Sequence, residues 1–226
     1  MISITEESAK TTIRWTDSYP VEIGPRLRAE RERRAMSLRE LAKRVNLSPS
    51  LISQIETGKA RPSVGSLYAL TSALGLSIDR LFTGPSDVAG PNRSGADGTR
   101  DSADEVPPLV VRAMNRKAID LDSGVRWERL TAASHPDVDF LHVVYAPGGA
   151  SAATMTRHGG REFGIVLSGI LTVTVNFDDY VLWPGDSIAF PSTTPHRLWN
   201  ASEEAVQAIW VVVGRHRTSE SVGHLT

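Results

Sequence analysis

Three side chains in the second half of the chain have the types and spacing that metal or ligand binding requires. His158 and Glu162 lie four residues apart, and His196 follows in a later segment. Two imidazoles and one carboxylate can hold a divalent metal such as Zn, Mn, Fe or Ni while leaving coordination positions open. The alternative is that the three residues hydrogen-bond an organic effector or one another. Cysteine is absent from the chain, which excludes thiolate metal sites, disulfides and cysteine nucleophiles.

A second group of polar side chains, in the first half of the chain, has the character of a nucleic-acid contact. Ser50, Ser53 and Gln54 fall on one side of a helical period, and Ile52 and Ile55 fall on the other. Short uncharged side chains suit hydrogen bonding to base edges, and glutamine can pair with adenine through two hydrogen bonds. Ser50 suits a phosphate as well as a base. With the neighbouring cations that would lie beside phosphates, the predicted DNA-contacting residues are Arg39, Lys43, Ser48, Ser50, Ser53, Gln54, Lys59 and Arg61.

The charges are distributed unevenly along the 226 residues. The formal net charge is −1, but residues 23–82 contain eleven Lys and Arg against five Asp and Glu. Residues 83–105 contain two against five, and residues 106–226 contain ten against twelve. A basic module joined to an acidic remainder indicates a polyanionic partner for the first module alone.

Composition and length exclude several classes of protein. Hydrophobic residues make up 40% of the chain and charged residues 23%, which is ordinary for globular proteins. The chain is longer than one typical domain of ~100–150 residues, so two domains are expected. No apolar run approaches the ~20 residues that cross a bilayer, and the amino terminus lacks an export signal. A cytoplasmic protein with no membrane contact is therefore expected.

Helical periodicity dominates the first half of the chain, and five helices are predicted over residues 23–82. The second helix is expected to begin after Ser37, which has the spacing of a capping box with Glu40. The third is expected to begin after Ser48, with Pro49 in the favoured first position, and to end at Gly58. The remaining helices are expected over residues 23–35, 63–74 and 77–82.

The period changes in the second half of the chain. Residues 83–105 are dense in Gly, Pro, Ser and Asp and are predicted to form a flexible linker, which lets the two modules move independently unless they dock. Residues 106–214 contain at least seven short β-rich runs separated by turn-forming groups, which indicates a sandwich or a small barrel. Residues 1–22 are expected to form a loose arm, and residues 215–226 a tail.

The first module resembles the lambda-repressor-like helix-turn-helix family, the XRE family, in the blocks SLRELA, SPSLISQIETGKARPS and LYALTSALG. The resemblance implies that residues 48–57 hold the recognition helix with its flanks and that Glu56 belongs to its structural end. It also implies that Ala35 stands where the family usually has a glycine. Because tight binding by modules of this size requires two half-sites ~34 Å apart, a homodimer on a palindromic duplex operator is expected.

The second module resembles the cupin family, a double-sheet β-barrel whose mouth holds a metal or a small ligand. The resemblance rests on two segments, PGGASAATMTRHGGREFGIVLSG and WPGDSIAFPSTTPHRLWN. It implies an effector pocket formed by Thr156, His158, Glu162 and His196. Thr156 stands where the first motif normally supplies another histidine, and a neutral hydroxyl is a poor metal ligand.

Other side chains of the second module carry weaker signals. Arg157 and Arg161 flank His158, where they either neutralise an acidic effector or point into solvent. The aromatic residues of this module are expected mainly in the core rather than as ligand contacts, and they include Trp127, Tyr145, Phe163, Trp183, Trp199 and Trp210.

These expectations define a two-domain α + β protein, with an N-terminal five-helix helix-turn-helix domain at residues 23–82 and a C-terminal all-β cupin domain at residues 106–214. The favoured function is sequence-specific DNA-binding transcriptional regulation, with a cupin domain that senses a small-molecule effector and dimerises, and without enzymatic activity. The alternative is a cupin metalloenzyme, of dioxygenase or isomerase type, that carries a DNA-binding module. A third possibility is an antitoxin-like protein whose helical module contacts another polypeptide.

Overall fold

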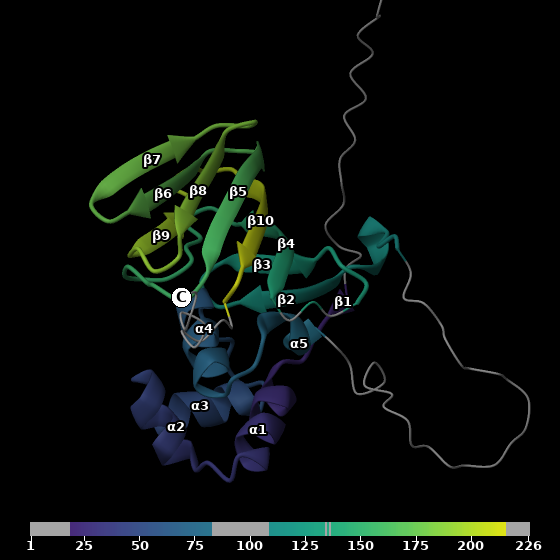
Figure 1. Ribbon diagram of the computed structural model, residues 1–226, viewed down its shortest axis with the longest axis vertical. Coiled ribbons are helices and arrows are strands. Elements are labelled where there is room, and N and C mark those ends of the chain that lie inside the picture. Colours follow the sequence, from purple (N-terminus) through teal and green to yellow (C-terminus); the bar gives the residue numbers. More distant parts are fainter. Residues whose placement is uncertain (1–18, 83–108, 134, 136, 216–226) are drawn as a thin grey trace, which may run out of the picture.

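The computed structural model describes residues 19–82, 109–133, 135 and 137–215, which form a helical domain and a β-barrel domain (Figure 1). The predicted linker, residues 216–226 of the predicted tail and most of the predicted arm lie outside the described residues. Within the described part of the chain, no helix is long and apolar enough to cross a membrane. The fold class is the one that the sequence predicts.

Five α-helices form the first domain, and their number is as predicted. They are α1 (Gly24–Arg33), α2 (Leu38–Val45), α3 (Pro49–Glu56), α4 (Val64–Ala73) and α5 (Ile78–Phe82). At the start of α2, the Ser37 hydroxyl accepts a hydrogen bond from Glu40 N at 3.2 Å, and Ser37 N donates to the Glu40 carboxylate at 2.8 Å. At the start of α3, the Ser48 hydroxyl accepts from Leu51 N at 3.1 Å. Both caps satisfy backbone N–H groups that a helix terminus leaves unpaired, which confirms the predicted helix starts.

The turn after α1 shows why the position of Ala35 favours glycine. The backbone φ of Ala35 is +51°, in the left-handed region. A residue with a Cβ atom pays roughly 1–2 kcal/mol for this conformation, and glycine does not. The strain lies between α1 and α2, away from the polar face of α3.

Two antiparallel sheets form the second domain. The larger sheet has the order β1-β2-β3-β4-β10-β5-β8, in which only the β1–β2 pair is parallel, and the smaller has the order β7-β6-β9. The strands are β1 (Tyr19–Pro20), β2 (Lys117–Leu121), β3 (Val125–Arg129), β4 (Val138–Tyr145), β5 (Arg161–Ser168), β6 (Leu171–Val175), β7 (Asp178–Leu182), β8 (Ser187–Pro191), β9 (His196–Trp199) and β10 (Val206–Val213). Alternate residues of β5 and β10 are buried between the two sheets, as a half-buried strand requires.

Three of these strands, β1, β2 and β7, have no counterpart among the β-rich runs that the sequence predicts. β1 falls in the stretch predicted as a loose arm, and it forms by pairing with β2 about a hundred residues further along the chain. β7 is exposed at every residue except Leu182, so its sequence lacks the apolar alternation that marks a half-buried strand. β1 and β7 are thus defined by their pairing partners rather than by their own periodicity.

The two domains are docked. The sequence alone left open whether the two modules dock or move independently. Gly65 N of α4 donates to Ser151 O at 3.2 Å, and Asp122 N of the barrel domain donates to Pro62 O at 3.0 Å. Helix α5 contacts β2 and β4. Figure 1 shows α4 and α5 directly beneath the barrel, with α1, α2 and α3 further away.

A buried ion pair joins two helices of the helical domain. Arg31 of α1 donates two hydrogen bonds to Glu56 of α3, from Nε at 2.7 Å and from Nη2 at 2.8 Å, and a third from Nη1 to Met36 O at 2.9 Å. The Glu56 side chain is 4% exposed. Glu56 thus ties the end of α3 to α1, which confirms its structural role.

Replacing Arg31 by Met is expected to lower the free energy of unfolding of the helical domain by about 3–5 kcal/mol, because the Glu56 carboxylate would remain buried without a partner. Urea unfolding of the full chain, followed by far-ultraviolet circular dichroism, measures this loss. The matched control is Arg28→Met, which removes an exposed ion pair with Glu32 and should change stability little. Similar losses in the two variants would contradict the structural role of the buried pair.

Candidate functional site

The outer face of α3 is polar and open to solvent. Ser50 and Gln54 are exposed and Ser53 is half-buried, whereas Ile52 and Ile55 on the opposite side are each 1% exposed. This is the division that the helical period predicts. Because α2 and α3 lie at the end of the helical domain remote from the barrel, the barrel does not cover this face (Figure 1).

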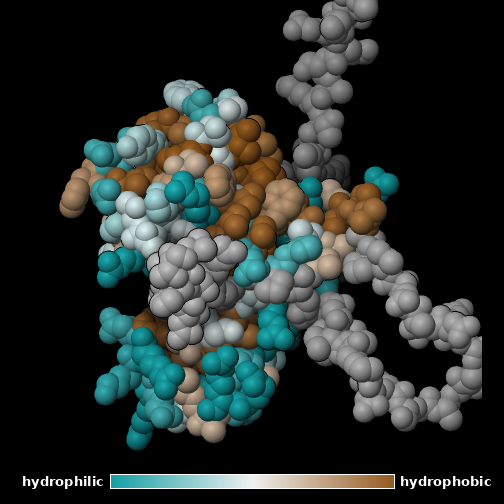
Figure 2. Space-filling model, in the orientation of Figure 1, coloured by the Kyte–Doolittle hydropathy of each residue, from teal (hydrophilic) through white to brown (hydrophobic). Residues whose placement is uncertain are grey.

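Basic residues of α2 and of the segment after α3 are exposed to solvent. Arg39 and Lys43 of α2 are exposed, as are Lys59 and Arg61 in the segment after α3. Figure 2 shows a hydrophilic surface over much of the helical domain. Ser48 is exposed as well, but its hydroxyl is engaged as the cap of α3. Of the predicted DNA-contacting residues, Ser53 is half-buried and the others are exposed, with Ser48 at the amino-terminal end of α3.

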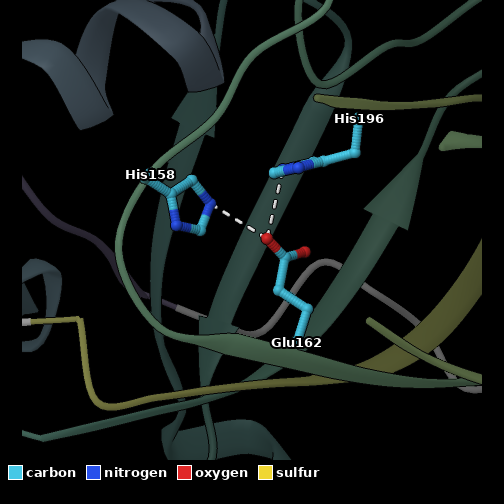
Figure 3. Close-up of side chains that lie close together, drawn as sticks. All are labelled: His158, Glu162 and His196. Atoms are coloured by element: carbon cyan, nitrogen blue, oxygen red, sulfur yellow. Dashed lines mark ion pairs between the residues drawn. The ribbon is translucent and has the colours of Figure 1, made fainter. Parts of the chain in front are cut away.

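A second cluster lies inside the barrel, where His158, Glu162 and His196 converge (Figure 3). Glu162 lies on β5, His196 is the first residue of β9, and His158 lies in the loop that leads into β5. Nε2 of His158 is 2.9 Å, and Nε2 of His196 is 3.1 Å, from the same carboxylate oxygen, Oε1 of Glu162. The three ligand atoms lie within 4.8 Å of one another. The structure thus brings together the three residues that the sequence singles out.

The other nitrogen of each imidazole faces a backbone carbonyl. Nδ1 of His158 is 2.9 Å from Gly159 O, and Nδ1 of His196 is 2.8 Å from Thr194 O. A carbonyl can only accept a hydrogen bond, so in the neutral rings we assign the proton to Nδ1, which leaves a lone pair on each Nε2. Two nitrogen lone pairs and a carboxylate oxygen then face one another. Such a set of acceptors requires either additional protons or a divalent cation between them.

The environment of Glu162 keeps its carboxyl group ionised. Its second oxygen, Oε2, accepts a hydrogen bond from the indole N–H of Trp210 at 2.7 Å. Burial raises the pKa of Glu162, but when the imidazoles are protonated on Nε2 as well, hydrogen bonds from His158 and His196 outweigh burial and hold the pKa well below its usual range. Burial likewise lowers the pKa of His196, but the hydrogen bond and charge of Glu162 outweigh it and raise the pKa overall. An ionised carboxylate is the form that a metal ligand needs.

Thr156 lies in the same pocket but does not complete a fourth ligand position. Its backbone N donates to His196 O at 2.9 Å, and its backbone O accepts from His196 N at 2.8 Å. Its hydroxyl is directed at the same His196 carbonyl, at 3.4 Å. The donor set that fits a divalent metal is therefore the two imidazoles and the carboxylate.

Two residues at the mouth of the pocket were missed by sequence reasoning. The ring of Tyr68, on α4, is centred 4.8 Å from the ring of His158. The guanidinium carbon of Arg215, beyond β10, is 3.5 Å from the centre of the Tyr68 ring. Tyr68 has the spacing of an ordinary core residue in its helix, so no local signal marks it. The flanking cations Arg157 and Arg161 are exposed, and Arg215 is the arginine at the mouth.

The remaining lining of the pocket is mainly apolar and aromatic. Of the aromatic residues considered from the sequence, Trp127, Tyr145 and Trp210 line the pocket, while Phe163 and Trp183 are exposed. An apolar wall with a few convergent polar groups is typical of small-molecule sites.

Both domains match known families. Residues 27–81 match the helix-turn-helix family, and residues 141–212 match the cupin domain family. The chain is therefore a transcriptional regulator that joins an XRE-type helix-turn-helix domain to a cupin domain.

Individual proteins resemble all or part of the chain. The chain is 29% identical over 181 residues to the HTH-type transcriptional regulator PuuR of Escherichia coli (strain K12), covering 79% of this chain and 88% of PuuR. It is 50% identical over 62 residues to the uncharacterized HTH-type transcriptional regulator y4dL of Sinorhizobium fredii, covering 27% of this chain and 32% of that protein. Among solved structures, an HTH_3 family transcriptional regulator from Vibrio cholerae shares the fold, with a TM-score of 0.58 and 21% identity over 85% of this chain and 95% of that chain.

The geometry of the cluster predicts that the full chain binds one divalent metal ion. Glu162→Gln preserves the volume of the side chain but removes its charge, and it should weaken Mn²⁺ or Zn²⁺ binding by at least about 100-fold. Isothermal titration calorimetry on protein freed of metal by a chelator measures this change. The exposed Glu203→Gln is the matched control and should bind as the wild type does. Stoichiometric binding that survives Glu162→Gln, or no binding by the wild type, would contradict the metal prediction.

Proposed function

We propose that this regulator reads duplex DNA with the outer face of α3 and that a small molecule in the cupin pocket controls its binding. The observation that supports DNA reading is that Ser50 and Gln54 are exposed and Ser53 is half-buried on the outer side of α3, with exposed cations in α2 and in the segment after α3. Short uncharged side chains on a helix that enters the major groove can reach base edges, while flanking cations hold the helix against phosphates. Because the target is the cell's own DNA, we expect the protein in the cytoplasm.

Replacing Gln54 by Ala is expected to weaken binding to the DNA upstream of the protein's own gene about tenfold, because one bidentate base contact contributes ~1–3 kcal/mol. Replacing Lys59 by Ala should weaken binding to all sequences and reduce the salt slope of the affinity by about 1. Fluorescence anisotropy with upstream and random duplexes, at several salt concentrations, separates the two effects. The control is Arg161→Ala, on the barrel, which should change neither. An affinity that does not depend on salt would contradict the proposal.

The cupin pocket supports the sensing part of the proposal. Its polar cluster lies among apolar and aromatic walls, which suits a small ligand with one polar end. His158, Glu162 and His196 would hold a divalent metal, which when bound offers open positions to an oxygen or nitrogen atom of the effector.

A second candidate function is metal-dependent catalysis, because two histidines and one carboxylate with open positions also suit oxygen chemistry at iron. The relatives named as transcriptional regulators favour regulation, and the fold alone does not confer activity. Oxygen consumption by the iron-loaded full chain in the presence of a small metabolite would favour the enzyme.

We infer that the regulator is a homodimer joined through the outer face of the larger sheet. Across this face Phe140 and Phe163 flank Val211, and Ile165 lies beside Ile209. The five large apolar side chains exposed there, by between 37% and 47%, are Phe140, Phe163, Ile165, Leu167 and Val213. They offer roughly 400 Å² of apolar surface, about half of the ~800 Å² that each partner contributes to a stable interface, and the polar rim would supply the rest. Figure 2 shows apolar side chains gathered over β5 and β10. A second copy is the occupant that a palindromic operator requires.

Replacing Phe163 by Arg is expected to convert the protein from two chains to one in sedimentation equilibrium, because a charge would be buried at the centre of the apolar face. The matched control is Val181→Arg on β7, which is 53% exposed and belongs to the smaller sheet. It should leave the dimer intact. A dimer that tolerates Phe163→Arg, or a monomeric wild type, would contradict this interface.

A further inference from the structure

The cupin pocket borders the DNA-binding domain. Val64 and Tyr68 of α4 line it together with Thr156 and His158 of the barrel. The space left among the lining residues holds little more than a water molecule. Building on the regulatory function proposed above, we propose that α4 is the roof of the effector pocket, so that an occupant larger than a metal ion binds only when Tyr68, and with it the DNA-binding domain, moves away.

Tyr68 is enclosed by groups of the barrel domain. Its ring is centred 5.2 Å from the Trp127 ring and 4.8 Å from the His158 ring. Arg215 lies over the ring, and Nε of Arg215 is 3.6 Å from Oδ2 of the buried Asp139. A cation held over an aromatic face attracts it electrostatically, so Arg215 fastens Tyr68 to the mouth. The side chain that closes the pocket is therefore held by its contacts with barrel residues.

The backbone of α4 approaches the barrel as closely as a glycine allows. A Cβ atom built on Gly65 would lie 3.3 Å from both Ala152 Cβ and Thr156 Cγ2. Thr156, in turn, is joined through its backbone to His196. No water layer separates the helix from the pocket wall at this point, so α4 and the wall form one packed contact.

Helix α5 holds the two domains together at a second place. Asp79 is 3% exposed, and its carboxylate lies 3.4 Å from Nη1 of Arg129 and accepts a hydrogen bond from His135 N at 2.9 Å. The guanidinium carbon of Arg129 is 5.9 Å from the centre of the Phe82 ring. Because Arg129 and His135 belong to the barrel domain, removal of the roof must break or tilt this second contact as well.

Displacement of the roof would carry the DNA-reading face with it. Another side of α4 contributes Leu67 and Leu70 to the helical core, where α4 packs against α2 and α2 packs against α3. Packed helices of this kind move as a unit rather than deform. An effector that binds only the opened arrangement shifts the population toward it, and DNA that prefers one arrangement must change effector affinity by the same factor.

A disulfide that locks the roof tests this inference, because the natural chain has no cysteine. The double variant Gly65→Cys, Ala152→Cys places two Cβ atoms close to the separation that a disulfide needs. The probe is diethyl pyrocarbonate, which acylates imidazole, applied to metal-free full-length protein. Peptide mass spectrometry then gives the modification rates of His158 and His196, with the exposed His135 as internal reference. In the oxidised, locked form we expect both pocket histidines to react at least about tenfold more slowly than in the reduced form, because opening is blocked.

A second pair of variants keeps the test decisive. Tyr68→Ala removes the closing ring and should raise the rates at His158 and His196 about tenfold, whereas Tyr68→Phe keeps the ring and should stay within about twofold of wild type. Thermal melting checks that each variant is folded; if Tyr68→Ala is not, the locked and reduced forms decide. Equal rates at His158 and His196 in those two forms would overturn the inference. DNA binding by the wild type is measured separately. If the protein binds DNA but the locked and reduced forms react equally, only the inference about α4 is wrong. If the locked form is protected but the protein does not bind DNA, only the proposed function is wrong.

Discussion

Helix α4 is buried on two sides, and this constraint links the two halves of the molecule. Leu67 and Leu70 enter the core of the helical domain, while Val64 and Tyr68 enter the mouth of the barrel. Because one helix of ten residues packs into both domains, the two domains must be correctly placed around it. The position of the helical domain, with α3, relative to the barrel is therefore set by packing within the described residues.

Electrostatic interactions hold together the polar groups of the pocket beneath α4, where the remaining space holds little more than a water molecule. A buried carboxylate is costly unless its charge is matched, and here Glu162 is matched by two imidazoles and by the indole N–H of Trp210. Backbone carbonyls orient both imidazoles, which leaves their remaining nitrogens directed at the same oxygen. Protons or a divalent cation at the centre of the cluster would each balance the charge of the carboxylate. The same cluster touches the ring of Tyr68 through His158.

Local patterns in the sequence predict much of this arrangement. The caps of α2 and α3 follow from Ser37 and Ser48, the outward face of α3 follows from the helical period, and the pocket triad follows from the cupin resemblance together with the ligand types. The docked arrangement does not follow from any local pattern. Val64 and Tyr68 are four residues apart on one helical face, which is the spacing of a core stripe; Val64 is indeed buried and Tyr68 is partly buried, but against the other domain. Arg215 and the β1–β2 pair likewise depend on partners that are remote in the chain, so only the folded structure reveals them.

The central claim is that this protein reads duplex DNA as a dimer through α3. Hydroxyl-radical footprinting on the DNA upstream of its own gene tests that claim most directly. The account predicts two protected patches on one face of the duplex, about one helical turn or ~34 Å apart, with the centres of both patches in adjacent major grooves. Uniform cleavage of the duplex, at protein concentrations well above those at which the dimer forms, would contradict it.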